Sequence, residues 1–282
     1  MNKVNLLAGV AFALAASALY SPAYSADVTL CAGSPGRNYD SVMKGIGIEL
    51  QNRGHNVTIK NLKGSEDILR QLDAGTCDYG PAQKDIHWKL SKDNAGFAQT
   101  VTAMSLLYNE AITMFCSKDS GIDELSDLDE NSTVIVDTIG SGSALTWDNL
   151  VNIEKEYGNG SSWINAKIEF APLDEAQAKM SLGEADCAFG VGAVPSNWAL
   201  TLQENGETLS WVYDKDINDL VVGKSSLYPG IRVARGAYSG KFDTYAVPAI
   251  LFRSNKKPKN EEIDSLIKRM APSIGAKYNT VK

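Results

Sequence analysis

The chain has few residues of the kinds that carry catalysis or bind metal ions. It contains only two histidines, His55 and His87, and neither has a metal-ligand spacing or a neighbouring nucleophile. A zinc site or a serine–histidine triad needs such partners. The sequence also lacks a Gly-x-Ser-x-Gly elbow, and the turn Gly140-Ser141-Gly142-Ser143 lacks the lysine of a Walker loop. The residues therefore indicate no catalytic group, no metal ion and no cofactor.

Long apolar runs are scarce beyond the N-terminus. Residues 6–19 are almost uniformly apolar, Lys3 precedes them, and Ala23-Tyr24-Ser25 places small residues at the positions that a signal peptidase reads. The run is shorter than the about 20 residues that a comfortable bilayer span needs. We expect residues 1–25 to be a cleaved signal peptide without a lipoprotein cysteine, and the rest of the chain to be a soluble protein of the periplasm.

Basic residues are fewer than acidic ones. The chain has 27 Lys and Arg against 34 Asp and Glu, which gives a formal net charge of −7. An acidic excess argues against a nucleic-acid partner. An acidic ligand would therefore have to be held by local donors.

Apolar β-like runs alternate with helical patterns along most of the chain, which is typical of βαβ units and a mostly parallel sheet. In the first half we expect a helix from about Tyr39, with Val42, Ile46 and Leu50 on one face, and a second helix with Ser65 as its N-cap. Pro81 lies in the run 78–83 and cannot donate to a sheet ladder, so this strand should be short or end before Gln83. The other expected elements are the strands 28–30, 56–60, 133–137, 167–170 and 186–189, and the helices 144–156 and 175–182.

Two of these strands end in small-residue turns from which a helix starts. The first turn is Gly33-Ser34-Pro35-Gly36-Arg37 and the second is Gly140-Ser141-Gly142-Ser143. Unpaired backbone N–H groups and the positive end of a helix dipole favour an anion at such a turn. Two turns of this kind in one exported chain predict two lobes that hold one small acid.

Side chains near these turns add to the prediction. The guanidinium of Arg37 can hold a carboxylate through two parallel charge-assisted hydrogen bonds, although a solvated arginine in a turn is the alternative. Tyr39, Trp147 and Trp198 are candidate walls for the ligand, with plain core packing as the alternative.

The end of the chain departs from the alternating pattern. The apolar run 245–254, a lysine-containing loop and a helix with Ile263, Leu266 and Ile267 on one stripe indicate that the chain returns to the first lobe. We therefore expect residues 26–109 and 247–282 to form lobe 1, and residues 110–246 to form lobe 2.

Four cysteines would enter an oxidising compartment, where three pairings are possible. All four lie in or beside apolar β-like runs, so buried thiols are an alternative to disulfides. The hypothesis that keeps each bridge within one lobe pairs Cys31 with Cys77 and Cys116 with Cys187.

Several segments occur in a characteristic order. The most specific are Ser105-Leu106-Leu107-Tyr108-Asn109-Glu110 and Asp119-Ser120-Gly121-Ile122. The others are the segments 33–39, 63–66, 75–83, 125–128, 140–143, 183–192 with Pro195, and 235–240. This order, which covers almost all of the chain after the signal peptide, resembles the TAXI family of TRAP-transporter solute-binding proteins.

The resemblance implies a type II periplasmic-binding fold. In such a fold two α/β lobes, each a mostly parallel sheet flanked by helices, are joined by hinge strands and close on a small carboxylate such as an amino acid or a dicarboxylate. It also implies a monomer that delivers this ligand to an integral-membrane TRAP permease. Pro35, Arg37 and Asn38 stand where the family usually has a glycine pair and hydroxyl residues, so the ligand can differ from the commonest family ligand. The expected ligand contacts are Ser34, Arg37, Asn38, Tyr39, Gln83, Ser141, Gly142, Ser143, Gly192 and Pro195.

Three other functions stay open at this point. A binding protein of an ABC importer or a sensor shares the fold and differs in its membrane partner. An exported enzyme that acts on a small acid is a second alternative, since fold does not fix function. A structural or adhesive exported protein is the third.

Overall fold

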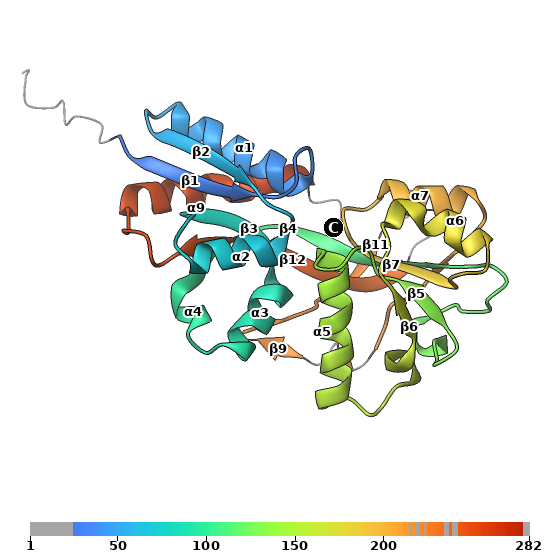
Figure 1. The fold of residues 1–282 in the computed structure, drawn as a ribbon. Helices are drawn as coiled ribbons and strands as arrows, with labels where there is room; N and C mark the ends of the chain where they lie inside the picture. Colours follow the sequence, from blue (N-terminus) through green and yellow to red (C-terminus); the bar gives the residue numbers. More distant parts are fainter. Residues whose placement is uncertain are drawn as a thin grey trace, which may run out of the picture.

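Two lobes lie side by side and are joined by two long strands (Figure 1). The computed structural model describes residues 25–278 except 215, 218, 219, 223, 234–236 and 239–241, so all of the expected signal peptide but Ser25 lies outside the described residues. The joining strands are β4 (Val101–Cys116) and β12 (Phe242–Ser254), each of which contacts strands of both lobes. In the described part of the chain, no helix has the length and apolarity of a membrane span.

One ten-stranded mixed sheet runs through both lobes, in the order β2-β1-β3-β12-β4-β7-β5-β6, with β11 paired to β12 and β8 to β4. Parallel pairs join β1 to β2 and β3, and β5 to β6 and β7, whereas β4 and β12 are antiparallel to their neighbours. The predicted two-lobed α/β fold is thus confirmed. The remaining strands are β1 (Asp27–Ala32), β2 (Asn56–Asn61), β3 (Tyr79–Gln83), β5 (Thr133–Ile135), β6 (Lys167–Glu169), β7 (Cys187–Gly192), β8 (Thr208–Ser210), β11 (Gly230–Val233) and a separate pair, β9 (Val221–Val222) and β10 (Ser225–Ser226).

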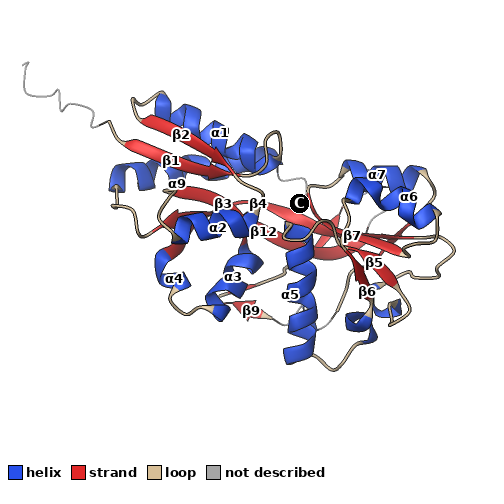
Figure 2. Ribbon diagram, in the orientation of Figure 1, coloured by secondary structure: helices blue, strands red, loops and turns tan. Residues whose placement is uncertain are grey.

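Helices cover both faces of the sheet in each lobe (Figure 2). In the first lobe α1 (Asn38–Gln51) and α9 (Glu261–Gly275) share one apolar cluster, and α2 (Ser65–Asp73) and α3 (Lys84–Asp93) share another beside α4 (Phe97–Thr100). In the second lobe α5 (Gly142–Tyr157) packs on one face, while α6 (Ala176–Ser181) and α7 (Asn197–Glu204) pack on the other. The packing of α9 against α1 places the last helix on the first lobe.

The period-2 alternation of strands explains why both faces are apolar. On β1, Leu30 packs with α1, and its neighbour Cys31 packs with α2. On β4, Met114 packs with α5, and Phe115 packs with α6 and α7. A strand buried on both faces is therefore apolar at consecutive positions.

Both hypothesised disulfides are confirmed. Cys31 of β1 is bonded to Cys77 just before β3, and Cys116 at the end of β4 is bonded to Cys187 at the start of β7. Each bond therefore closes a connection between neighbouring strands of the sheet.

Some element boundaries differ from the sequence prediction. β3 continues through Pro81 to Gln83, because β3 pairs along its length with β12 and meets β1 only at Tyr79. Ser65 is the first residue of α2 and not its cap, because its hydroxyl accepts a hydrogen bond from the Gln83 N–H. α5 starts two residues earlier than expected, at Gly142.

Candidate ligand-binding site

The turn between β1 and α1 is shaped by a carboxylate. The Gly36 N–H, with φ of +79° at this residue, donates to Asp40 Oδ2 at 2.8 Å. Lys44 Nζ donates to the same oxygen at 2.7 Å, and Asn61 donates to the other at 2.8 Å. These bonds, with that from Lys44 foremost, hold the pKa of Asp40 down at about 2. The ionised Asp40 therefore fixes the turn, while Arg37 in the same turn is exposed.

The turn between β5 and α5 is a second strained connection. Asp137 and Gly140 both have positive φ values, +72° and +79°. Ser141 caps α5, since its hydroxyl accepts a hydrogen bond from the Ala144 N–H at 3.1 Å. The N–H groups at the first helical positions have no acceptor within the helix. The second predicted turn therefore presents backbone donors at the positive end of a 16-residue helix.

The charges of Arg37, on the first turn, and Asp137, on the second turn, influence each other. Burial raises the pKa of Asp137, and the positive charge of Arg37 lowers it in part. The guanidinium on the first turn is thus within electrostatic range of the second turn. A carboxylate between the two turns would meet this cation and the start of α5.

Gln83 and Gly142 are in direct contact between the lobes. Gln83 ends β3, Gly142 begins α5, and a methyl group on Gly142 would overlap the side-chain oxygen of Gln83. Gln83 is only 3% exposed. Its N–H donates to Ser65 Oγ at 3.1 Å, and this hydroxyl donates to Gln83 Oε1 at 3.3 Å. The amide is therefore held against the first lobe at the point where the second lobe comes closest to it.

Glu110 lies beside this contact and was not among the predicted site residues. Its pKa is raised to about 8, chiefly by burial and then by the charge of Asp85, while hydrogen bonding with Gln83 and Tyr39 lowers it in part. Glu110 lies on β4, one residue before Ala111, which pairs with both β12 and β7. The sequence signal was a single acidic residue within the long apolar run that became β4.

Two tyrosine hydroxyls near Glu110 are buried. They belong to Tyr39 and Tyr108, whose ring centroids are 6.3 Å apart. The Tyr39 hydroxyl lies near Ser65 and Glu110, and Asn38 lies near Tyr108. These hydroxyls can each donate one hydrogen bond, so they belong to the polar groups around Glu110 that a bound ligand would meet.

The other predicted contacts have more varied surroundings. Ser143 is buried, and its hydroxyl accepts a hydrogen bond from the Val191 N–H at 3.0 Å, which ties α5 to β7. Gly192 is half-buried at the end of β7. Ser34 and Pro195 are exposed, and the Ser34 carbonyl accepts a hydrogen bond from the Arg37 N–H at 3.2 Å within the first turn. Arg37, Tyr39, Gln83, Ser141 and Gly142 are thus the predicted residues that the fold places around the approach of the two lobes.

Of the candidate wall residues, Trp147 is part of the core, and the half-buried Trp198 packs against it. The Trp147 ring packs edge-on against Trp163 and Phe189, with centroids 5.7 and 5.0 Å away. Trp198 lies against Gly190 and edge-on to Phe115. Tyr39 alone of the three lies at the predicted site.

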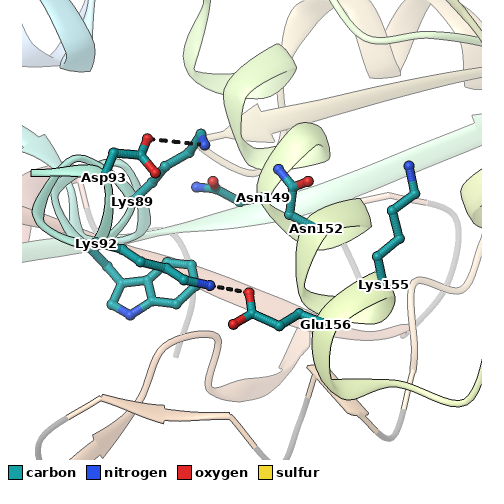
Figure 3. A pocket seen from close by; sticks show the side chains of 8 residues that line it. Lys89, Lys92, Asp93, Asn149, Asn152, Lys155 and Glu156 are labelled. Carbon is teal, nitrogen blue, oxygen red and sulfur yellow. Dashed lines mark hydrogen bonds and ion pairs between the residues drawn. The ribbon is translucent and has the colours of Figure 1, made fainter.

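A hollow of about 360 Å³ lies between α3 and α5 (Figure 3). An ion pair between Lys92 and Glu156 spans it, and Lys89 pairs with Asp93 at 3.3 Å. None of the ten predicted ligand contacts lines this hollow. It lies beside the C-terminal half of α5, whereas Gly142 lies at the N-terminus of that helix. Its lining residues are Trp88, Lys89, Lys92, Asp93, Asn149, Asn152, Lys155 and Glu156.

Buried polar bonds also join the lobes next to the start of α3. The carboxylate of Asp85 accepts hydrogen bonds from Thr146 at 2.7 Å and from Tyr228 at 2.9 Å. Lys84 donates to the Ser225 hydroxyl at 2.7 Å. The lobes are therefore in contact at Gln83 and at the two residues that follow it.

Both histidines have structural contacts elsewhere. The His87 ring stacks on Phe252 at 4.6 Å and bonds to the Val101 carbonyl at 3.1 Å, and His55 Nδ1 accepts a hydrogen bond from the Ala26 N–H.

The candidate site offers the N–H donors at the start of α5, the Arg37 cation and the Glu110 carboxyl with its raised pKa. These are groups for binding a polar small molecule.

Solved structures with the same fold are transporter proteins. One is a protein from Listeria monocytogenes described as an L-cystine ABC transporter. Its sequence is 15% identical to this one, the match covers 90% of this chain and 96% of that chain, and the TM-score is 0.51. A substrate-binding protein of an amino acid ABC transporter is 13% identical over 89% and 94%, with a TM-score of 0.50. A TRAP periplasmic solute-binding protein from Sulfitobacter sp. NAS-14.1, with bound β-D-galacturonate, is 11% identical over 89% and 81%, with a TM-score of 0.48.

At 15% and 13% identity, the structures with TM-scores of 0.51 and 0.50 show that this chain shares their fold. No curated protein matches the chain. The model of one protein family, however, matches residues 30–272, from β1 through most of α9. The chain therefore belongs to the NMT1-like family.

Proposed function

We propose that this protein is a periplasmic solute-binding protein that captures a small carboxylate between its lobes and delivers it to a TRAP-type permease. Residues 26–109 and 247–282 form lobe 1, residues 110–246 form lobe 2, and β4 and β12 are the hinge. The protein acts as a monomer after removal of residues 1–25, without a cofactor. The family, the shared fold and the TAXI resemblance of the sequence support this proposal.

The observation that carries the proposal is the approach of two turns from opposite lobes. Arg37 and the start of α5 face the same region, and Gln83 meets Gly142 there. A micromolar dissociation constant requires about 8 kcal/mol. A helix N-terminus contributes about 0.3–2 kcal/mol and a charged hydrogen bond about 1.5–3 kcal/mol, so enclosure has to provide the rest. Closure excludes water and strengthens each polar contact.

Glu110 favours an amino acid over a dicarboxylate as the ligand. This carboxyl faces Gln83, Tyr39 and the charge of Asp85, and no basic side chain among the described residues shifts its pKa. A dicarboxylate would add a further negative charge beside two acids. An ammonium group would instead pair with Glu110, lower its pKa and displace its proton.

The decisive experiment is native mass spectrometry of freshly purified protein. We expect a small amino acid or related carboxylate bound at one molecule per chain. Calorimetry with that compound near pH 7, in two buffers of different ionisation enthalpy, should then give release of close to one proton for the wild type and none for Glu110→Gln. Binding without proton release would overturn the assignment of the ammonium group to Glu110 and leave the binding function standing.

Two further results bear on the alternatives. Recovery of the compound unchanged after long incubation excludes an enzyme that acts on it, and its conversion would overturn the binding proposal. A neighbouring gene for a two-part permease supports a TRAP partner, whereas a neighbouring ATPase gene would assign the protein to an ABC importer.

A further inference from the structure

Three acidic side chains of the second lobe converge at the far end of α5. Glu154 lies near the C-terminus of that helix, and Asp214 and Asp216 lie in the segment that follows β8. One carboxylate oxygen from each residue lies within 4.8 Å of the others. Two oxygens that bind one Ca²⁺ ion at about 2.3–2.6 Å are at most about 5 Å apart. The spacing therefore fits a single shared ion.

Glu154 offers an oxygen that nothing else uses. Its side chain is only 1% exposed. Oε1 accepts hydrogen bonds from the N–H groups of Gly160 and Ser161 at 3.0 and 2.9 Å, whereas Oε2 is buried and has no hydrogen-bond partner among the described residues. A side chain at Gly158 would overlap this carboxyl group. The carboxylate is thus held in one orientation, with a free buried oxygen whose desolvation is uncompensated.

The two aspartates are also oriented by neutral donors. Trp163 Nε1 donates to Asp214 Oδ2 at 3.0 Å, and Ser161 Oγ donates to the same oxygen at 3.3 Å. Asn159 donates to Asp216 at 3.1 Å. In the described part of the chain, no Lys, Arg or His forms an ion pair with any of the three acids.

The electrostatics of the site call for a cation. Three carboxylates share one small volume, and the negative end of the α5 dipole lies beside them. Like charges at such short range repel one another unless a positive charge lies between them. The hydrogen bonds from Trp163, Ser161 and Asn159 orient the acids and leave the repulsion in place.

We propose that Glu154, Asp214 and Asp216 bind one divalent cation, with Ca²⁺ preferred. Carboxylate oxygens are hard ligands that suit Ca²⁺, Mg²⁺ and Mn²⁺ rather than soft-ligand metals. Ca²⁺ fits best because it accepts irregular geometry and can recruit neighbouring carbonyl oxygens and water. The ion would fasten the C-terminal end of α5 to the segment that follows β8 and so stabilise the second lobe, independently of the ligand between the lobes.

The hydrogen bond from Trp163 to Asp214 supplies a spectroscopic test. Tb³⁺ replaces Ca²⁺ at oxygen sites and emits when a nearby tryptophan is excited. After removal of metal ions with a chelator, the full chain should show saturable tryptophan-sensitised Tb³⁺ emission at one ion per chain, which Ca²⁺ displaces at lower concentration than Mg²⁺. Ca²⁺ should also raise the melting temperature of the wild type. Absence of saturable emission together with an unchanged melting temperature overturns the proposal.

Variants decide whether these three acids form the site. We expect Asp216→Asn to weaken Tb³⁺ binding at least about tenfold and to abolish the Ca²⁺ effect on melting. The matched control is Asp148→Asn, since Asp148 lies exposed on the same helix and should be without effect. Equal binding by the wild type and a folded Asp216→Asn variant overturns the assignment. If that variant fails to fold, Glu154→Gln takes its place, and unchanged binding there has the same meaning.

Discussion

The replacement Glu110→Gln removes a half-buried acid from the approach of the two lobes and keeps its shape. Burial, followed by the charge of Asp85, raises the pKa of Glu110 from 4.5 to about 8 in the folded protein. A carboxyl whose pKa rises on folding binds its proton more tightly in the folded chain than in the unfolded chain. The folded state therefore loses stability as the pH rises from the unfolded pKa through the folded pKa.

The size of this loss follows from the two pKa values. For a single group with a pKa of 4.5 unfolded and about 8 folded, the free energy of unfolding falls by about 2.5 kcal/mol between pH 5 and pH 7. The fall continues until the pH exceeds the folded pKa. Glutamine does not titrate, so Glu110→Gln should lack this component while it keeps the contributions of all other groups.

The assay is urea denaturation of ligand-free wild type and Glu110→Gln at pH 5, 7 and 8. The difference in unfolding free energy between the two proteins should move by about 2.5 kcal/mol from pH 5 to pH 7, in favour of the variant at the higher pH. Glu49→Gln serves as a control, because Glu49 is exposed on α1. A difference for Glu110→Gln that stays constant within about 0.5 kcal/mol refutes the buried, protonated state of this carboxyl.

Three further results are expected. Alkylation should label no cysteine until the protein is reduced. The disulfides close loops of 46 and 71 residues, so breaking either one should lower the free energy of unfolding, measured by denaturation, by about 4 kcal/mol. Arg37→Ala should weaken calorimetric binding of the co-purified acid about tenfold or more, since it removes charge-assisted hydrogen bonds. Gly142→Ala should push against Gln83, keep the lobes apart, and so weaken binding and reduce the ligand-induced compaction seen by small-angle X-ray scattering.

Matched variants separate these effects from general damage. Arg53→Ala removes an exposed arginine beyond the other end of α1 and should leave binding unchanged. Gly64→Ala adds a methyl group where no atom lies within 4 Å, so it should not affect compaction. Unchanged affinity for Arg37→Ala would remove that side chain from the site, and full compaction of Gly142→Ala would mean that closure does not pass through the contact with Gln83. Label uptake without reductant would exclude the disulfides.

Local patterns in the sequence were sufficient for the elements but not for their ends. The fourfold spacing of Val42, Ile46 and Leu50 placed them on the buried face of α1, because that spacing follows from the geometry of the helix itself. The end of β3 depended on which strands lie beside Pro81, and the role of Ser65 depended on the N–H of Gln83. Neither neighbour is near in the chain, so propensity and spacing contained no information about them.

By itself the sequence determined the alternation of strands and helices and the two glycine–serine turns, since these depend on residues close together in the chain. The pairing of the cysteines, which are 46 and 71 residues apart, was one hypothesis among three pairings until the structure brought them together. Tertiary structure alone decided the protonation of Glu110, the contact of Gln83 with Gly142, and the convergence of Glu154 with Asp214 and Asp216. Burial and charge proximity arise between segments that are far apart in the chain. Their magnitudes are therefore set by how the two lobes pack, and no local pattern encodes them.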